Sequence, residues 1–148
     1  MNTIPNALLS GLAGAVVLNA IHETVRQVES KAPHIQKLGE RGVVKITKAT
    51  GLPTPTGNAL YATAMAGDIV SNTLYYSLIG LAKPPAVLPL GAVLGALAGA
   101  GAVTLAGPLG LGGAPVRRTA TTASLTVAWY LIGGLTAAGI FSWLNRSK

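Results

Sequence analysis

Four long apolar runs, separated by polar segments, determine the organisation of the chain. They cover residues 4–21, 59–81, 86–106 and 123–144. An α-helix of about 20 apolar residues crosses the hydrocarbon core of a bilayer, and each run has roughly that length. The pattern therefore predicts an all-α fold, an integral membrane bundle of four transmembrane helices that forms one domain over residues 1–148. The third run consists mainly of Ala, Gly and Leu, so a re-entrant segment is the alternative there.

The segment 22–58 is the one sizeable polar loop. Its apolar residues recur at roughly helical spacing, interrupted by Pro33, Gly39 and Gly42. The same segment is rich in Lys and Arg. This combination predicts short, basic amphipathic helices that lie on the membrane surface. A docking surface for a partner protein is the alternative.

The composition favours lipid, not water, as the surrounding solvent. Charged residues make up 10% of the 148 residues, whereas 50% are apolar. The surface of a soluble domain needs more charge than this. A net charge of +7 would suggest nucleic-acid binding in a soluble protein. Here the cations flank the apolar runs, so we expect the basic loop to meet anionic lipid headgroups and expect no nucleic-acid partner.

The distribution of Lys and Arg predicts an orientation in the membrane. Eight of the eleven lie in the first and third loops, and the other three lie in the second loop and at the C-terminus. Cytoplasmic loops carry the excess of positive charge in membrane proteins. We therefore expect both termini outside, in a prokaryotic inner membrane.

Asp68 is the strongest functional pointer, because it lies in the middle of the second apolar run. An Asp at the bilayer centre costs about 2.5–3.5 kcal/mol on insertion, so it needs a partner, a hydrated cavity or a proton. Helical spacing places Tyr61, Asn72 and Tyr75 on the same face as Asp68. The second run should therefore carry a polar stripe that faces the bundle interior.

Asn19 is the first candidate for a polar partner of that stripe. A rise of about 1.5 Å per residue sets it at a depth similar to Asp68 if the first two spans are adjacent. His22, Glu23 and Arg26 continue its face of the helix towards the surface. This polar cluster has three interpretations: a structural hydrogen-bond network between two helices, a proton or ion pathway, and a catalytic or metal-binding site.

The motifs of common enzyme classes are missing from the sequence. No cysteine is present, which excludes disulfides and thiolate catalysis. Neither a phosphate-binding loop nor a serine nucleophile elbow occurs. A metal site would have to combine His22, Glu23, His34 and Asp68, but no second histidine shares a helix face with His22. We therefore expect neither a metal nor a cofactor.

Glycines at regular spacing predict close helix packing. Gly91, Gly95 and Gly99 are four residues apart, so they share one face of the third predicted helix. Such a face lets another backbone approach closely in a membrane. Its partner is either the fourth helix, through Gly134, or a second subunit. Gly11 offers a smaller surface of the same kind on the first helix.

These features favour a small membrane protein that acts without catalysis, as an accessory or scaffolding component of a homo-oligomer or a larger membrane complex. The first alternative is a small oligomeric transporter or channel that uses Asp68. The second alternative is a membrane-embedded enzyme or metal site that uses His22, Glu23 and Asp68. The non-enzymatic role, which would use the glycine face and the basic loop, explains the most residues with the fewest assumptions.

Overall fold

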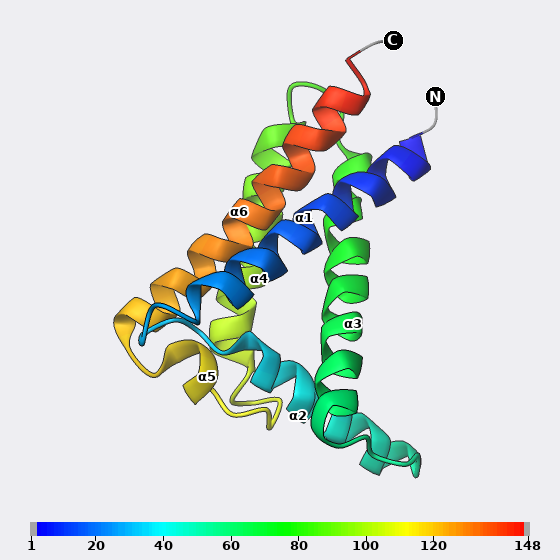
Figure 1. Ribbon diagram of the computed structural model, residues 1–148. Coiled ribbons are helices and arrows are strands. Elements are labelled where there is room, and N and C mark those ends of the chain that lie inside the picture. The colour runs from blue at the N-terminus through cyan, green and yellow to red at the C-terminus, as the bar shows by residue number, and fades with distance from the viewer. Residues whose placement is uncertain (1–2, 147–148) are drawn as a thin grey trace.

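The computed structural model describes residues 3–146, and over that range every regular element is helical (Figure 1). This confirms the predicted all-α class. In chain order the elements are α1 (Thr3–Val25), α2 (Ile35–Thr50), α3 (Gly57–Tyr76), the 3-10 helix η1 (Ser77–Leu81), α4 (Val87–Leu105), α5 (Ala114–Arg117) and α6 (Ala120–Leu144). The start of α1 and the end of α6 lie at the same end of the bundle.

Within residues 3–146, three helices are long and apolar enough to cross a membrane: α1, α4 and α6. The predicted fourth span is not confirmed. The run 59–81 instead divides into α3 and η1, and Asn58, Asp68 and Asn72 lower the apolar content of α3. The third run forms an unbroken helix, α4, long enough for a full span.

Several helix boundaries differ from those of the apolar runs. Helix α1 continues to Val25, so its last turn is polar. Helix α6 begins at Ala120, because the hydroxyl of Thr119 accepts a hydrogen bond from the backbone N–H of Thr122 at 3.0 Å. A hydroxyl at this position satisfies a donor that the first helical turn leaves unpaired.

The core forms where α6 packs between α1 and α4. The three glycines of α4 lie directly on α6: a Cβ on Gly95 would be 2.6 Å from the Cα of Leu131 and from the carbonyl oxygen of Tyr130. A Cβ on Gly99 would be 2.6 Å from the Cα of Val127. Such distances leave room for hydrogen alone. The glycine face of α4 is therefore filled within the chain.

Gly91 and Gly134 meet at the same α4–α6 contact, each against the backbone of the other helix. Glycines of α1 make the same kind of close backbone contact with two other helices. Gly14 faces the carbonyl of Gly133 on α6, where a Cβ would lie 2.5 Å away, and Gly11 faces the carbonyl of Thr73 on α3. Small residues thus bring α1 close to both of its neighbours.

Helix α2 is one continuous helix, where the sequence predicted several short ones. It runs through Gly39 and Gly42, although each glycine costs about 1 kcal/mol relative to Ala in a helix. Gly39 lies against Ala64 of α3, so its missing side chain permits a close contact between these two helices. The helix ends at Gly51, which has a φ of 71° and closes the last turn by a hydrogen bond from its N–H to the carbonyl of Thr47.

The α4–α6 contact makes a direct prediction. Gly95→Ala should lower the free energy of unfolding by about 1–3 kcal/mol, because the new methyl group forces two backbones apart. Gly139→Ala is the matched control, since nothing lies within 4 Å of its Cβ position. It should be neutral or stabilise the protein by up to about 1 kcal/mol. Unfolding of both variants in mixed micelles measures the difference, and equal stabilities would contradict the close contact.

Candidate functional site

The polar cluster joins α1 to α3 through Asp68. The amide nitrogen of Asn19 donates to Oδ2 of Asp68 at 2.9 Å and to the carbonyl of Ala15 at 3.0 Å. The amide nitrogen of Asn72 donates to Oδ1 of Asp68 and to its carbonyl, each at 3.0 Å. Both carboxylate oxygens of Asp68 therefore accept a hydrogen bond from a side-chain amide of the same chain.

A second part of the cluster lies at the last turn of α1. Arg26 donates from Nη2 and Nε to Oε2 of Glu23, at 2.5 and 3.1 Å. Among residues 3–146 this is the single ion pair, and both side chains are about one-quarter exposed (29% and 26%). Tyr61 of α3 lies near the pair. This part of the cluster is therefore also at the α1–α3 contact.

His22 packs against α6. Its side chain is 3% exposed, and its ring centroid lies 5.0 Å from that of Trp129 and 5.9 Å from that of Tyr130. Neither ring nitrogen has a hydrogen-bond partner within the described chain. Burial of an unpaired polar group is costly, so this ring is the least satisfied polar group of the cluster.

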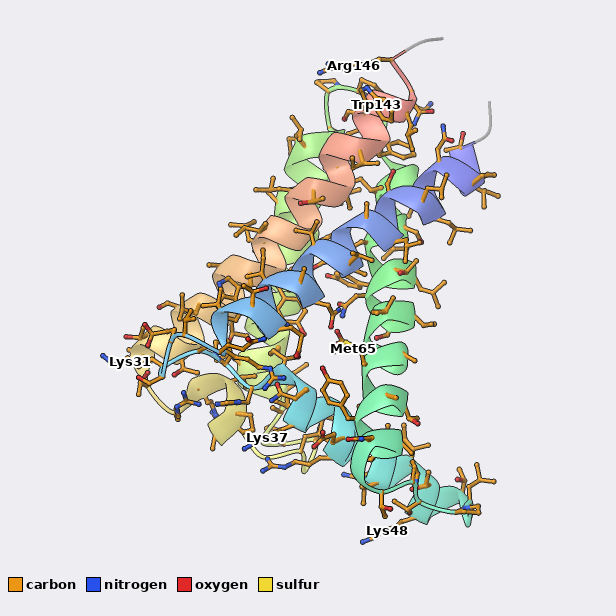
Figure 2. All side chains as sticks on the ribbon, in the orientation of Figure 1. Lys31, Lys37, Lys48, Met65, Trp143 and Arg146 are labelled. Carbon is orange, nitrogen blue, oxygen red and sulfur yellow. The ribbon has the colours of Figure 1, made fainter. Side chains whose placement is uncertain are left out.

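A small cavity of about 10 Å³ lies between α1, α2 and α3. That volume holds about one water molecule. Polar side chains from all three helices line it, and Ile35, Gly39, Ala64 and Met65 complete the wall. The polar members are Asn19, His22, Glu23, Gln36 and Asp68. Met65 points from α3 towards the inside of the bundle (Figure 2).

Two tyrosines of α3 reach other helices. Tyr75, expected on the stripe with Asp68, donates from its hydroxyl to the carbonyl of Leu94 on α4 at 3.0 Å. Tyr76, which the sequence did not single out, is fully buried and donates to the carbonyl of Tyr130 on α6 at 2.8 Å. These two hydrogen bonds attach the end of α3 to the apolar core. The sequence signal that could have indicated these contacts is the pair of neighbouring tyrosines near the end of an apolar run.

The four candidate metal ligands do not form a metal site. His34 lies before α2, outside the polar cluster, and its Nδ1 is 3.3 Å from the amide nitrogen of Gln36. Burial lowers the pKa of His34, and the nearby charges of Arg118 and Lys37 lower it further. Within residues 3–146, no group of three His, Cys, Asp or Glu side chains could hold a metal ion.

The basic loop folds back onto the protein. Arg41 donates to the carbonyl of Leu111 at 2.6 Å, and Lys45 donates to the carbonyl of Leu109 at 2.5 Å. Arg118 donates to the carbonyls of Ser30 and Ala32 in the turn after α1. Lysines 31, 37 and 48 project from this end, far from Arg146 and Trp143 at the other end (Figure 2). The basic residues thus serve the fold as well as the surface.

Comparison of the chain with protein families, with curated proteins and with solved structures finds no match. The geometry of the polar cluster and of the basic end therefore carries the functional inference.

The hydrogen bond between Asn19 and Asp68 can be measured by a double-mutant cycle. We expect a coupling free energy of about 0.5–2 kcal/mol between Asn19→Ala and Asp68→Ala, the range found for polar contacts between membrane helices. Asp68→Ala combined with Thr63→Ala is the control cycle, because Thr63 bonds the carbonyl of Ala59 within its own helix. A coupling near zero in the first cycle would exclude the interhelical bond.

Proposed function

We propose that the protein is a non-catalytic scaffold of the membrane, in which the polar cluster clamps α3 against α1. One observation carries the proposal: both carboxylate oxygens of Asp68 are bound by amides of the same chain. An ion or a substrate would have to compete with the amides of Asn19 and Asn72 for this carboxylate, and the cavity beside it holds about one water molecule. The structural use of Asp68 explains why α3 tolerates it.

The size of the adjacent cavity supports the same role. Its volume of about 10 Å³ admits one water and no substrate, whereas ligand pockets usually enclose about 300–1,000 Å³. The hydroxyls of Tyr75 and Tyr76 on α3 also bind within the chain, each to a backbone carbonyl. Polar side chains used in this way fix helices in register.

We further propose that α3 crosses the bilayer beside α1 as a fourth span. Helix α3 lies along α1, and α1 begins at the end of the bundle where α6 finishes (Figure 1). An even number of crossings accounts for that arrangement. The clamp on Asp68 and the contact of Gly11 with Thr73 would hold α3 in place despite its lower apolar content.

The scaffold would present its basic end to anionic headgroups of the cytoplasmic leaflet, or to an acidic surface of a larger membrane complex. Exposed lysines at positions 31, 37 and 48 are concentrated there. Each cation near an anionic membrane surface contributes about 1 kcal/mol of attraction. A homo-oligomer is the other assembly that such a scaffold could join.

A small proton or cation transporter is the second candidate function. Two observations favour it: the ring nitrogens of His22 have no partner within residues 3–146, and the water-sized cavity touches both His22 and Asp68. A water in that cavity could relay a proton between the two side chains.

Flux measurements in proteoliposomes decide between the two functions. The scaffold role predicts proton and sodium flux equal to that of protein-free liposomes, and no change on Asp68→Asn or His22→Phe. Flux above the protein-free level that Asp68→Asn abolishes would refute the scaffold role and establish transport. Circular dichroism of each variant confirms that the helices remain folded.

The orientation can be tested cleanly because the chain contains no cysteine. A single cysteine at Lys83 should react with a membrane-impermeant maleimide added to intact cells, because both termini and the second loop are expected outside. A cysteine at Lys48 should react only after the cells are opened. The reverse labelling pattern would place the basic end outside.

A further inference from the structure

We infer that a groove between α3 and α4 binds one anionic phospholipid, with an acyl chain in the groove and the phosphate on Arg41 and Lys45. This inference rests on the membrane location of the bundle. It does not depend on whether the polar cluster conducts ions. The groove, the two cations at its end and their free donors are three separate observations that support it.

The groove is an open hollow of about 450 Å³. Helices α3 and α4 make few contacts, among them the hydrogen bond from Tyr75 to Leu94, so space is left between them. Small residues deepen the α4 wall, where Ala98, Gly101 and Ala102 face the hollow. The volume lies within the range of binding pockets for small organic ligands. Its lining is mainly apolar, as a hydrocarbon chain requires.

Basic residues lie next to one end of the groove. Leu38 of α2 and the segment of Leu109 and Leu111 form that end. The carbonyls of those last two leucines accept the hydrogen bonds from Lys45 and Arg41. Both cations therefore bind the backbone of residues that line the apolar groove. A hydrocarbon chain in the groove would bring its own phosphate to the same place.

Arg41 and Lys45 retain most of their donors. A guanidinium has five N–H groups and an ammonium has three, and each side chain uses one of them on a carbonyl. Neither cation lies within ion-pair distance of a carboxylate in the described chain, where the single ion pair is Arg26 with Glu23. Both side chains are exposed. They are therefore free to bind an anion.

A second hollow of about 420 Å³ adjoins these cations. Arg41, Lys45 and Gly110 line it together with Glu40 and Leu60. The two cations and one carboxylate give it a formal charge of +1, which suits a headgroup with a single negative charge. Glu40 can also accept a hydrogen bond from a headgroup hydroxyl. Phosphatidylglycerol has both properties and is the appropriate probe.

A lipid fits this groove better than a helix of another subunit. The groove ends at α2 and at the segment that Arg41 and Lys45 hold, so a helix that crossed the whole bilayer there would collide with α2. An acyl chain terminates at its headgroup and needs no such continuation. The positive charge at the closed end also has no use in an apolar helix contact.

Native mass spectrometry of the delipidated, detergent-solubilised full chain tests the inference, with phosphatidylglycerol, phosphatidylcholine and glycerol 3-phosphate as probes. We expect one phosphatidylglycerol per chain, bound at least tenfold more tightly than phosphatidylcholine, and no binding of glycerol 3-phosphate. Equal affinity for the two lipids would overturn the role of the cations. Equal binding of glycerol 3-phosphate would overturn the role of the groove.

Two pairs of variants locate the site. Gly101→Leu should fill the groove and weaken phosphatidylglycerol binding at least tenfold, because a Cβ at Gly101 meets only Leu105, at 3.8 Å. Ala100→Leu, on the exposed face of the same helix, should leave binding unchanged. Arg41→Gln with Lys45→Gln should remove the preference for the anionic lipid, whereas Lys48→Gln should not.

The remaining outcomes are also decisive. Equal lipid affinities of the Gly101→Leu and Ala100→Leu proteins would refute the groove as the site. A dimer of the wild-type chain that only Gly101→Leu dissociates would identify a second copy as the occupant and overturn the lipid inference. Thermal unfolding of each variant confirms that it is folded. Ion flux, which tests the scaffold role, is measured separately and does not bear on these results.

Discussion

Close approach of helix backbones around α6 is the constraint on which the rest of the structure depends. Lipid tails are as apolar as leucine side chains, so no hydrophobic gain drives helices together inside a bilayer. The attraction must come from van der Waals contact, which grows as the backbones approach. Gly95 on α4 and Gly14 on α1 place two helices against α6 in this way. The positions of α3 and of the polar cluster follow from where those helices are held.

Helix α3 is held by different interactions. Its apolar content is the lowest of the long helices that run along the bundle, and its contacts rely on polar atoms as well as on small residues. Asp68 binds Asn19 of α1, Tyr75 binds a carbonyl of α4 and Tyr76 binds a carbonyl of α6. Polar bonds to three neighbours thus fix a helix that is less apolar than the others. The same arrangement leaves the open groove beside α4.

The sequence predicted the features that follow from periodicity. Residue spacing indicated the glycine face of α4, and helical rise placed Asn19 beside Asp68, where the structure has a hydrogen bond. The partners of Tyr75, Arg41 and Lys45 could not be predicted, because each binds a backbone carbonyl and every residue has one. Such contacts leave no signature in residue type. The position of His22 also required the structure, since a residue at the margin of a helix face can turn to either neighbour.

The long sequence separation of the contacts made by α2 has a consequence for biogenesis. Arg41 and Lys45 bind carbonyls that lie 70 and 64 residues further along the chain. A ribosome adds about 5–20 residues each second, so α2 leaves the ribosome several seconds before its partners exist. During that interval its basic, amphipathic surface lacks the contacts that it makes in the folded chain. The helix would reach its final place only after α4 and the segment that follows it have been made, so the end of the molecule that holds Arg41 and Lys45 assembles late.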